Sequence, residues 1–242
     1  MFKFEVGNDD FEVFMEAASS FCREGILQFE QEKVRFVGVD SAGVVLTECE
    51  VPGKIVSGDP EHIGLDFKML QQVAKKARGD TLHLEHDGGI VRIQAARTTY
   101  SLQTLVVPKC PNVPDIPSTV SIDINPDMLA EGILAVTDVA DNKDISAGVW
   151  FVWNNGQFKL RDKQEMVVEV EYGAEEYKGV PKEGVTSVRV LISKMYAERI
   201  AMMLKKYDVC RVAIGTDIPL VVVMKSDNQK CGFVVAPRIE VD

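Results

Sequence analysis

The histidines are the first residues to test for chemistry, because imidazole is the commonest general base and a frequent metal ligand. The chain has three of them, His62, His83 and His86. His83 and His86 are three positions apart in a segment that alternates like a β-strand, so their side chains point to opposite faces and cannot share a metal ion. The histidine pattern predicts neither a catalytic pair nor a metal site.

The cysteines are also poorly placed for chemistry. An odd number of cysteines without C-x-x-C spacing argues against a disulfide framework and against a zinc site. We expect buried or half-buried free thiols at all five positions, which are Cys22, Cys49, Cys110, Cys210 and Cys231.

One serine stands in a glycine-flanked stretch, Gly38-Val39-Asp40-Ser41-Ala42-Gly43. The spacing is not G-x-S-x-G, and no histidine is placed by a local motif to activate Ser41. The sequence also has no glycine-rich phosphate loop and no Walker motif. We therefore predict no catalytic residue, no cofactor and no metal, and a protein that is not an enzyme.

Length and composition favour an ordinary globular core. The 242 residues are 46% hydrophobic, enough for one large domain or two small ones. No apolar run approaches the roughly 20 residues that span a bilayer, and residues 1–6 alternate like a strand rather than a signal peptide. These features predict a soluble, intracellular protein without a membrane partner. The net charge of −10 argues against nucleic acid unless the basic residues gather on one face.

Hydrophobic periodicity predicts a repeated arrangement of helices and strands. Helices are expected at 8–22, 67–77, 126–139 and 194–206, with Asn8 or Asp9 capping the first and Ser193 the last. Strands are expected at 25–29, 33–39, 43–51, 81–86, 90–94, 99–106, 148–153, 157–160, 166–172 and 187–192, followed by two final strands. Lys68-Met69 and Lys194-Met195 occupy matching places, which indicates a tandem duplication with a period of roughly 125 residues.

A proline-rich segment separates the two halves. Residues 108–117 contain four prolines, which cannot lie inside a helix or in the middle of a sheet, so this segment is expected to be an extended and fairly stiff connector. Val113 and Ile116 are apolar, as a merely solvated linker would not require.

The charged residues of the helices divide by position. The first helix of each half carries acids and no lysine or arginine, namely Asp9, Asp10, Glu12, Glu16, Asp127, Glu131 and Asp138. The second helices carry Lys68, Lys75, Lys76, Arg78, Lys194, Arg199, Lys205 and Lys206. Cations near helix C-termini are also favoured by the helix dipole alone, so this pattern has a purely structural explanation as well.

The end of the chain and three other segments resemble a known family. The tail Phe233-Val234-Val235-Ala236-Pro237-Arg238-Ile239-Glu240, the Asp40-Ser41 loop, Ile116-Pro117 and the Pro219-Leu220-Val221-Val222 strand occur in the same order in the DNA sliding clamps of archaea and eukaryotes, the proliferating cell nuclear antigen family. The compact connector and short tail look most like the archaeal forms. Without the family resemblance, the Asp40 loop indicates a plain strand–turn–strand in which Asp40 and Ser41 bond their own backbone.

The resemblance implies an α+β subunit made of two similar clamp domains, 1–105 and 120–242, joined by a connector at 106–119. Three such subunits would close into a homotrimeric ring with helices inside and sheets outside. The ring would encircle duplex DNA without reading its sequence and tether DNA polymerase, the clamp loader and other replication and repair enzymes. Such a protein is a processivity factor, found with the nucleoid in the cytoplasm, or in the nucleus of a eukaryote.

The resemblance also assigns residues to two surfaces. A hydrophobic pocket for a short docking peptide would comprise Val39, Val44, Leu46, Val113, Ile116, Pro219, Val234, Val235, Ala236 and Pro237. Gly43 and Val39 depart from the larger polar residue and the Met that relatives often carry. The DNA-facing set would be Lys68, Lys75, Lys76, Arg78, Lys194, Arg199, Lys205 and Lys206.

Subunit contacts follow from the same resemblance. In clamps the last strand of the first domain pairs with a strand of the next subunit, which here implies residues 99–105 and 166–172. The second strand carries Glu165, Glu169 and Glu171, and Arg92 and Arg97 are candidate basic partners. Two alternatives remain open: a subunit of a heterotrimeric or checkpoint-type clamp, and a small α+β enzyme or ligand-binding protein.

Overall fold

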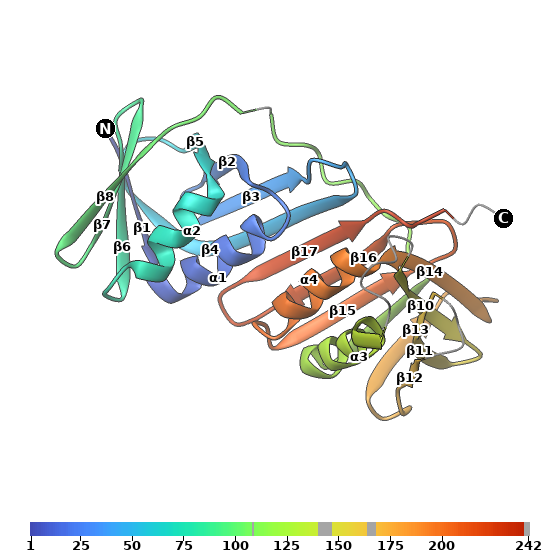
Figure 1. Ribbon diagram of the computed structural model, residues 1–242. Coiled ribbons are helices and arrows are strands. Elements are labelled where there is room, and N and C mark those ends of the chain that lie inside the picture. Colours follow the sequence, from blue (N-terminus) through green and yellow to red (C-terminus); the bar gives the residue numbers. More distant parts are fainter. Residues whose placement is uncertain (108, 140–146, 164–167, 240–242) are drawn as a thin grey trace. The chain divides into compact units, whose positions relative to one another are not determined.

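The computed structural model describes residues 1–107, 109–139, 147–163 and 168–239, and the chain packs as two units (Figure 1). The first unit comprises Met1–Val113 together with Asp227–Cys231, and the second comprises Pro114–Ser226 together with Gly232–Asp242. The predicted domain boundaries at 105/106 and 119/120 stay a prediction.

The first unit contains two helices and eight strands. They are β1 (Phe2–Gly7), α1 (Asn8–Ser19), β2 (Glu24–Phe29), β3 (Lys33–Val39), β4 (Val45–Ser57), β5 (Glu61–Asp66), α2 (Phe67–Lys76), β6 (Thr81–His86), β7 (Ile90–Ala95) and β8 (Thr98–Gln103). The long strand β4 pairs with β3 through its first half and with β1 through its second half. From β1 the antiparallel pairing continues through β6 and β7 to β8, while from β3 it continues through β2 to β5.

The second unit repeats this plan. Its elements are β9 (Val120–Ile124), α3 (Pro126–Val139), β10 (Gly148–Asn154), β11 (Gln157–Asp162), β12 (Glu169–Glu171), β13 (Tyr177–Pro181), β14 (Ser187–Ser193), α4 (Lys194–Leu204), β15 (Val209–Ile214), β16 (Leu220–Lys225) and β17 (Lys230–Val235). The first two residues of β17, Lys230 and Cys231, are grouped with the first unit. One sheet runs β13–β9–β15–β16–β17 and the other runs β12–β11–β10–β14.

The pairings confirm the predicted duplication. β1 pairs with β4 and β6, and β9 pairs with β13 and β15 in the same way. β2 pairs with β3 and β5, as β10 pairs with β11 and β14. The α+β fold class with two similar domains is therefore confirmed.

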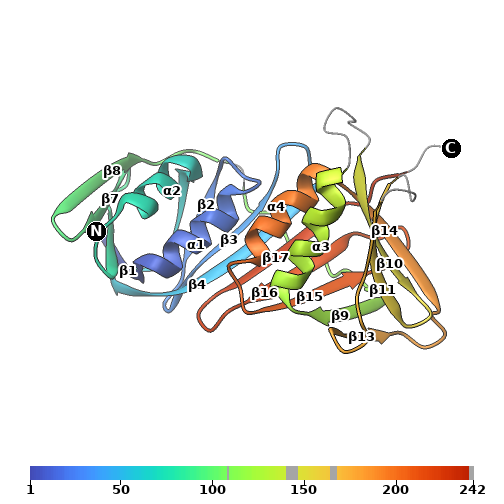
Figure 2. The same ribbon diagram turned by 60° about the horizontal axis from the view of Figure 1, so that its bottom comes forward.

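Each unit buries one face of a helix pair. α1 packs beside α2 and against β4, and α3 packs beside α4 (Figure 2). The predicted apolar sides are buried: Phe11, Phe14 and Met15 in α1, and Leu129 and Ile133 in α3. Full burial of side chains of this size contributes roughly 1.5–3 kcal/mol each relative to exposure. The helices are therefore held chiefly by their apolar faces, and their polar faces remain exposed for other contacts.

Several local predictions need correction. Gly7, rather than Asn8 or Asp9, is the N-cap of α1, and Ser193 caps α4 without a side-chain hydrogen bond. The first, second and last helices end earlier than predicted, at Ser19, Lys76 and Leu204.

The strand prediction also differs from the structure. It missed β5, β9 and β13, and three strands, not two, follow α4. Of the predicted strand 166–172, residues 166 and 167 lie outside the described residues, and β12 covers Glu169–Glu171. Among the described residues, no helix is long and apolar enough to cross a membrane.

Candidate functional site

Two of the three histidines are each paired with a glutamate. His83 Nδ1 is 3.0 Å from Glu5 Oε1, and His86 Nδ1 is 2.5 Å from Glu61 Oε2. Within the described ranges, no group of three or more histidine, cysteine, aspartate and glutamate side chains is placed to hold a metal ion.

The loop between β3 and β4 is organised by one carboxylate. Asp40 Oδ1 accepts the backbone N–H groups of Val44 (2.7 Å) and Val45 (2.8 Å), and the backbone nitrogen of Gly43 donates to Asp40 O at 3.0 Å. Gly43 has a φ of +71°, which favours glycine over residues with a side chain. The loop is therefore preorganised.

The three predicted docking residues of this loop differ in exposure. Val39 is 42% exposed, Val44 is half-buried, and Leu46 is buried. Val39 and Leu46 are opposite each other in the β3–β4 register, so their side chains lie on the same face of the sheet.

At the start of the connector, the backbone of Leu105 packs closely against Gly64. Leu105 N donates to Gly64 O at 2.8 Å, and a Cβ on Gly64 would lie 2.2 Å from Leu105 O, so only glycine fits there. Beyond this point a cavity of about 260 Å³ has Val39 and Val107 in its wall, together with Ile26, Phe36, Lys109, Cys110 and other residues. Val39 and the start of the connector thus share one cavity. The prediction did not single out Gly64, because nothing local in the sequence indicates this close approach.

Val113, at the end of the first unit, is 38% exposed, and the remaining docking residues belong to the second unit. Ile116, Pro219, Val234, Ala236 and Pro237 are all half-buried. Val235 has no exposed surface, because alternation along β17 turns it into the core while Val234 points the other way. Val235 thus packs in the core behind the predicted docking residues and cannot itself contact a partner in this conformation.

The tail after β17 is held by Arg238. Its backbone nitrogen donates to Leu191 O at 2.8 Å, and its guanidinium Nη1 donates to Ala147 O at 3.0 Å. Ile239, the next residue, is 88% exposed. Residue 240, which ends the family-like motif, lies outside the described residues. Arg238 therefore fixes the chain direction just after Pro237.

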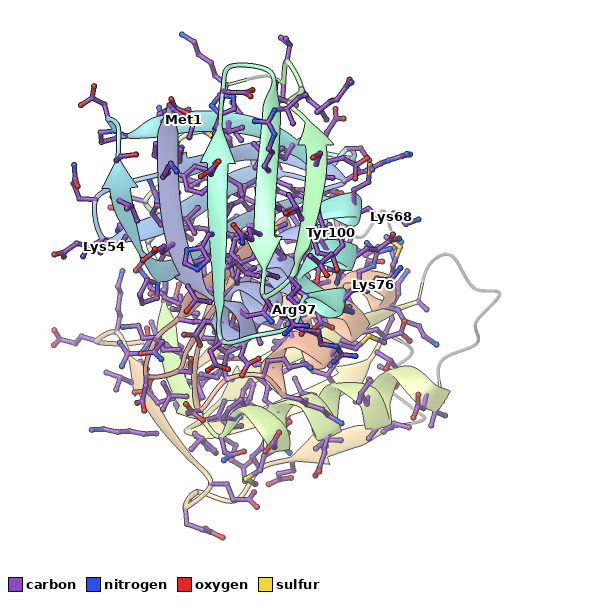
Figure 3. The ribbon with its side chains drawn as sticks, turned by 90° about the vertical axis from the view of Figure 1, so that its left-hand side faces the viewer. Met1, Lys54, Lys68, Lys76, Arg97 and Tyr100 are labelled. Atoms are coloured by element: carbon purple, nitrogen blue, oxygen red, sulfur yellow. The ribbon has the colours of Figure 1, made fainter. Side chains whose placement is uncertain are left out.

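The basic residues of α2 form one exposed face. Lys68, Lys75 and Lys76 are exposed, opposite the buried Leu70 and Val73. Figure 3 shows Lys68 and Lys76 projecting from the helix, with Arg97 and Tyr100 on the neighbouring β7–β8 hairpin. Arg78 is exposed but lies beyond the helix end. Asp66 begins this helix by accepting the N–H of Met69 at 2.9 Å.

The predicted DNA-facing residues in and just after α4 differ in their exposure. Lys194 has only 12% of its side chain exposed and lies 3.6 Å from Glu198, in the next turn of α4. Arg199 is exposed on the helix, whereas Lys205 and Lys206 are exposed just past its end. Lys194 is thus the weakest member of the predicted DNA-facing set.

The acidic side chains of β12 form ion pairs within the chain. On β11, Lys159 Nζ lies 3.1 Å from Glu169 and 2.9 Å from Glu171 of β12, and Arg161 also pairs with Glu169. The hydrogen bonds that Lys159 donates to Glu171 and then to Glu169 raise the pKa of Lys159. Partial burial raises the pKa of Glu169, but the bonds from Lys159 and Arg161 outweigh it and leave the pKa lowered. Glu165 lies outside the described residues.

Of the two candidate arginines near β8, Arg92 is also engaged within the chain. Arg92 Nη1 lies 2.5 Å from Asp87 Oδ2. Its hydrogen bond lowers the pKa of Asp87. Arg97 lies in the turn between β7 and β8, and Tyr100 lies on β8 (Figure 3).

Comparison with known proteins agrees with this architecture. No protein-family model matches the chain. The DNA polymerase sliding clamp 1 of Thermococcus kodakarensis is 24% identical over 97% of this chain and 96% of its own length. The DNA polymerase sliding clamp of Pyrococcus abyssi is likewise 24% identical, with the same coverage.

Solved structures show the same fold. The A. fulgidus PCNA bound to the C-terminal region of FEN-1 superimposes with a TM-score of 0.87 at 16% identity, covering all of both chains. PCNA from Thermococcus kodakaraensis gives 0.82 at 23% identity, over 97% of this chain and all of that one. These relatives are named for a clamp and not for a reaction, which agrees with the prediction of a protein without catalytic residues. Along nearly its whole length, the chain is similar to the archaeal DNA polymerase sliding clamps, and its fold is that of the PCNA structures.

Proposed function

We propose that this chain is the subunit of a sliding clamp, a homotrimeric ring that encircles duplex DNA and holds DNA polymerase and other DNA-processing enzymes on it. The observation that carries the proposal is the match to archaeal DNA polymerase sliding clamps over 97% of the chain, together with the duplicated fold. The mechanism requires no chemistry. A partner bound to the ring stays near its template because tethering raises its effective concentration.

DNA contact in this proposal is weak and independent of sequence. A closed ring is retained by topology, so non-specific affinities of about 10⁻⁴–10⁻⁶ M are sufficient. Lys68, Lys75 and Lys76 supply an exposed cationic face on α2. α1 and α3 contribute acids only, so the contact is weaker than in a clamp with basic residues on all four helices.

Partner docking uses the Val39–Leu46 loop, the connector and the tail. The preorganised Asp40 loop, the exposed Val39 and Val113, and the anchored tail support this assignment. Because the A. fulgidus PCNA was solved with the C-terminal region of FEN-1, a terminal segment of a processing enzyme is the expected ligand class. The clamp loader and DNA polymerase would use docking peptides of the same kind.

Assembly pairs β8 of one copy with β12 of the next. Each strand ends a chain of pairings in its unit, and exposed sheet edges are commonly protected by pairing. Since Glu169 and Glu171 already pair with Lys159, backbone hydrogen bonds and side-chain packing would hold this contact rather than new ion pairs with those acids.

Topological retention tests the proposal. The protein is loaded on a nicked circular plasmid by an archaeal clamp loader with ATP and washed in high salt, and the plasmid is then cut once. We expect the clamp to survive the wash on the circle and to be released by the cut. Equal release from circular and linear DNA would contradict encirclement.

A heterotrimeric clamp is the second candidate. The PCNA2–PCNA3 complex from Sulfolobus tokodaii gives a TM-score of 0.80 at 17% identity over 98% of this chain. Light scattering of the purified chain separates the two cases. A homotrimer has three times the 26.8 kDa subunit mass, whereas a persistent monomer favours an obligatory different partner.

A further inference from the structure

Two of the five cysteines lie in direct contact. Cys49 Sγ on β4 and Cys231 Sγ on β17 are 3.0 Å apart, and the two residues are 1% and 0% exposed. Both are free thiols. This separation is about 1 Å longer than a disulfide bond, so a small movement of either side chain closes it.

The backbone on both sides of the contact is fixed within the first unit. Cys49 lies opposite Phe36 in the middle of the β3–β4 ladder. The segment Asp227–Cys231 packs with the same unit, where Gln229 Nε2 and Asn228 Nδ2 donate to the carboxylate of Asp10 on α1. The two thiols are therefore held as neighbours by the fold.

The other thiols provide the competing pairs. Cys22 is close enough for its charge to act on Cys49, but burial, and secondarily Asp40, raise the pKa of its own thiol to about 11. Cys110 lies 3.9 Å from Ile26 O, and Cys210 belongs to the second unit. Of these, Cys22 is the competitor that a test must separate from Cys231.

We propose that Cys49 and Cys231 are an oxidation site, at which a small-molecule disulfide such as glutathione disulfide converts the two thiols into an intramolecular disulfide. Two S–H bonds and the S–S bond of the reagent break, and one protein S–S bond forms. The two electrons and two protons leave with two molecules of glutathione. The inference does not depend on the proposed function.

Burial determines when the reaction occurs. Exchange needs a thiolate and access of the reagent, and burial, followed by the bond to Cys231, raises the pKa of the Cys49 thiol well above its ordinary value. The folded, reduced protein should oxidise slowly at neutral pH. Oxidation should be fast when the strands form in the presence of the reagent, or when β17 opens.

The bond would act on the stability of the whole chain. It joins positions 182 residues apart and closes a loop that contains the connector and most of the second unit. Loops of this length strongly restrict the unfolded chain, and we expect the Tm to rise by about 10 °C on oxidation.

Refolding the full chain with glutathione disulfide tests the inference. Free thiols titrated in denaturant should fall from five to three, and a peptide digest without reductant should contain the Cys49–Cys231 pair. Reduction with dithiothreitol should restore five thiols and the lower Tm. This comparison uses the wild-type protein alone, so it does not depend on any variant folding.

Single cysteine variants identify which two cysteines form the disulfide. Cys231→Ala should abolish both the disulfide and the rise in Tm, whereas Cys22→Ala and Cys210→Ala should retain both. A Cys22–Cys49 linkage, five free thiols after refolding, or an unchanged Tm after complete oxidation would overturn the inference.

Discussion

Asp40 Oδ1 lies 2.7 Å from the backbone nitrogen of Val44 and accepts its N–H. A second bond of 2.8 Å, from Val45, reaches the same oxygen. One carboxylate thus fixes the path of the loop that presents Val39 and Val44. The loop lies within one unit, and it connects a local sequence motif to the proposed docking surface.

Removing this carboxylate should weaken docking more than folding. Asp40→Ala deletes both hydrogen bonds from the Val44 and Val45 N–H groups, so this surface loop loses its fixed path while the core is unchanged. We expect the affinity for a docking peptide to fall about ten-fold, measured by fluorescence polarisation, with a small change in Tm. Glu183→Ala, at another exposed turn, is the matched control. An unchanged affinity for Asp40→Ala would show that the loop does not take part.

A charge at Ile116 should also abolish docking. Ile116→Asp replaces a half-buried apolar side chain with a carboxylate that a hydrophobic ligand cannot solvate. The loss of one buried aliphatic contact predicts affinity at least about ten-fold lower in the same titration. Val180→Asp makes the same change at an exposed valine outside the set and should bind normally. Equal binding by both variants would count against the proposed surface.

The α2 cations should govern the salt dependence of DNA binding. Lys75→Glu with Lys76→Glu removes two exposed positive charges from each subunit, so the slope of log K against log salt should become shallower by about 1 for each lysine that contacts a phosphate. Peptide binding should be unaffected. Lys178→Glu with Lys182→Glu, which places the same charge change near β13, is the control. Loss of assembly instead of DNA affinity would place α2 at a subunit contact.

Acid stability should depend in part on Asp123. Arg211 Nε and Nη2 lie 2.6 and 2.9 Å from the two carboxylate oxygens of Asp123, and these bonds lower the pKa of Asp123 below its ordinary 3.8. Because the pKa of Asp123 is lower in the folded state, its bonds to Arg211 stabilise the fold at any pH above the ordinary pKa of aspartate. It is lost as the pH falls through the pKa of the folded state.

The pair is 45% and 61% exposed, so solvent limits its contribution to at most about 1 kcal/mol. Asp123→Asn should therefore reduce the stability difference between pH 7 and pH 3. Urea unfolding at fixed protein concentration measures it, and 1 M salt should reduce the effect. Identical pH profiles for both proteins would contradict this assignment.

The sequence predicted those parts of the fold that depend on local periodicity. Phe11, Phe14 and Met15 recur at helical spacing, and α1 buries all three. The bounds of α3 were predicted to the residue, because Pro126 starts the helix and its apolar positions run to its end. Short strands such as β9 and β13 escaped prediction, because five residues with few turn signals do not define a period.

Contacts between distant residues could not be predicted from the sequence. The contact between Cys49 and Cys231 arises from packing, and no spacing rule relates the two positions. The close approach of Leu105 to Gly64 is equally invisible in the pattern. Val235 was predicted to meet partners because it belongs to a motif, yet strand alternation buries it.

Imaging of the purified protein by negative-stain electron microscopy tests the central claim most directly, since a closed ring is what the proposal requires. We predict threefold particles with a central hole wide enough for duplex DNA. Particles of a single compact subunit, without a hole and at concentrations where homologous clamps are closed, would contradict the account.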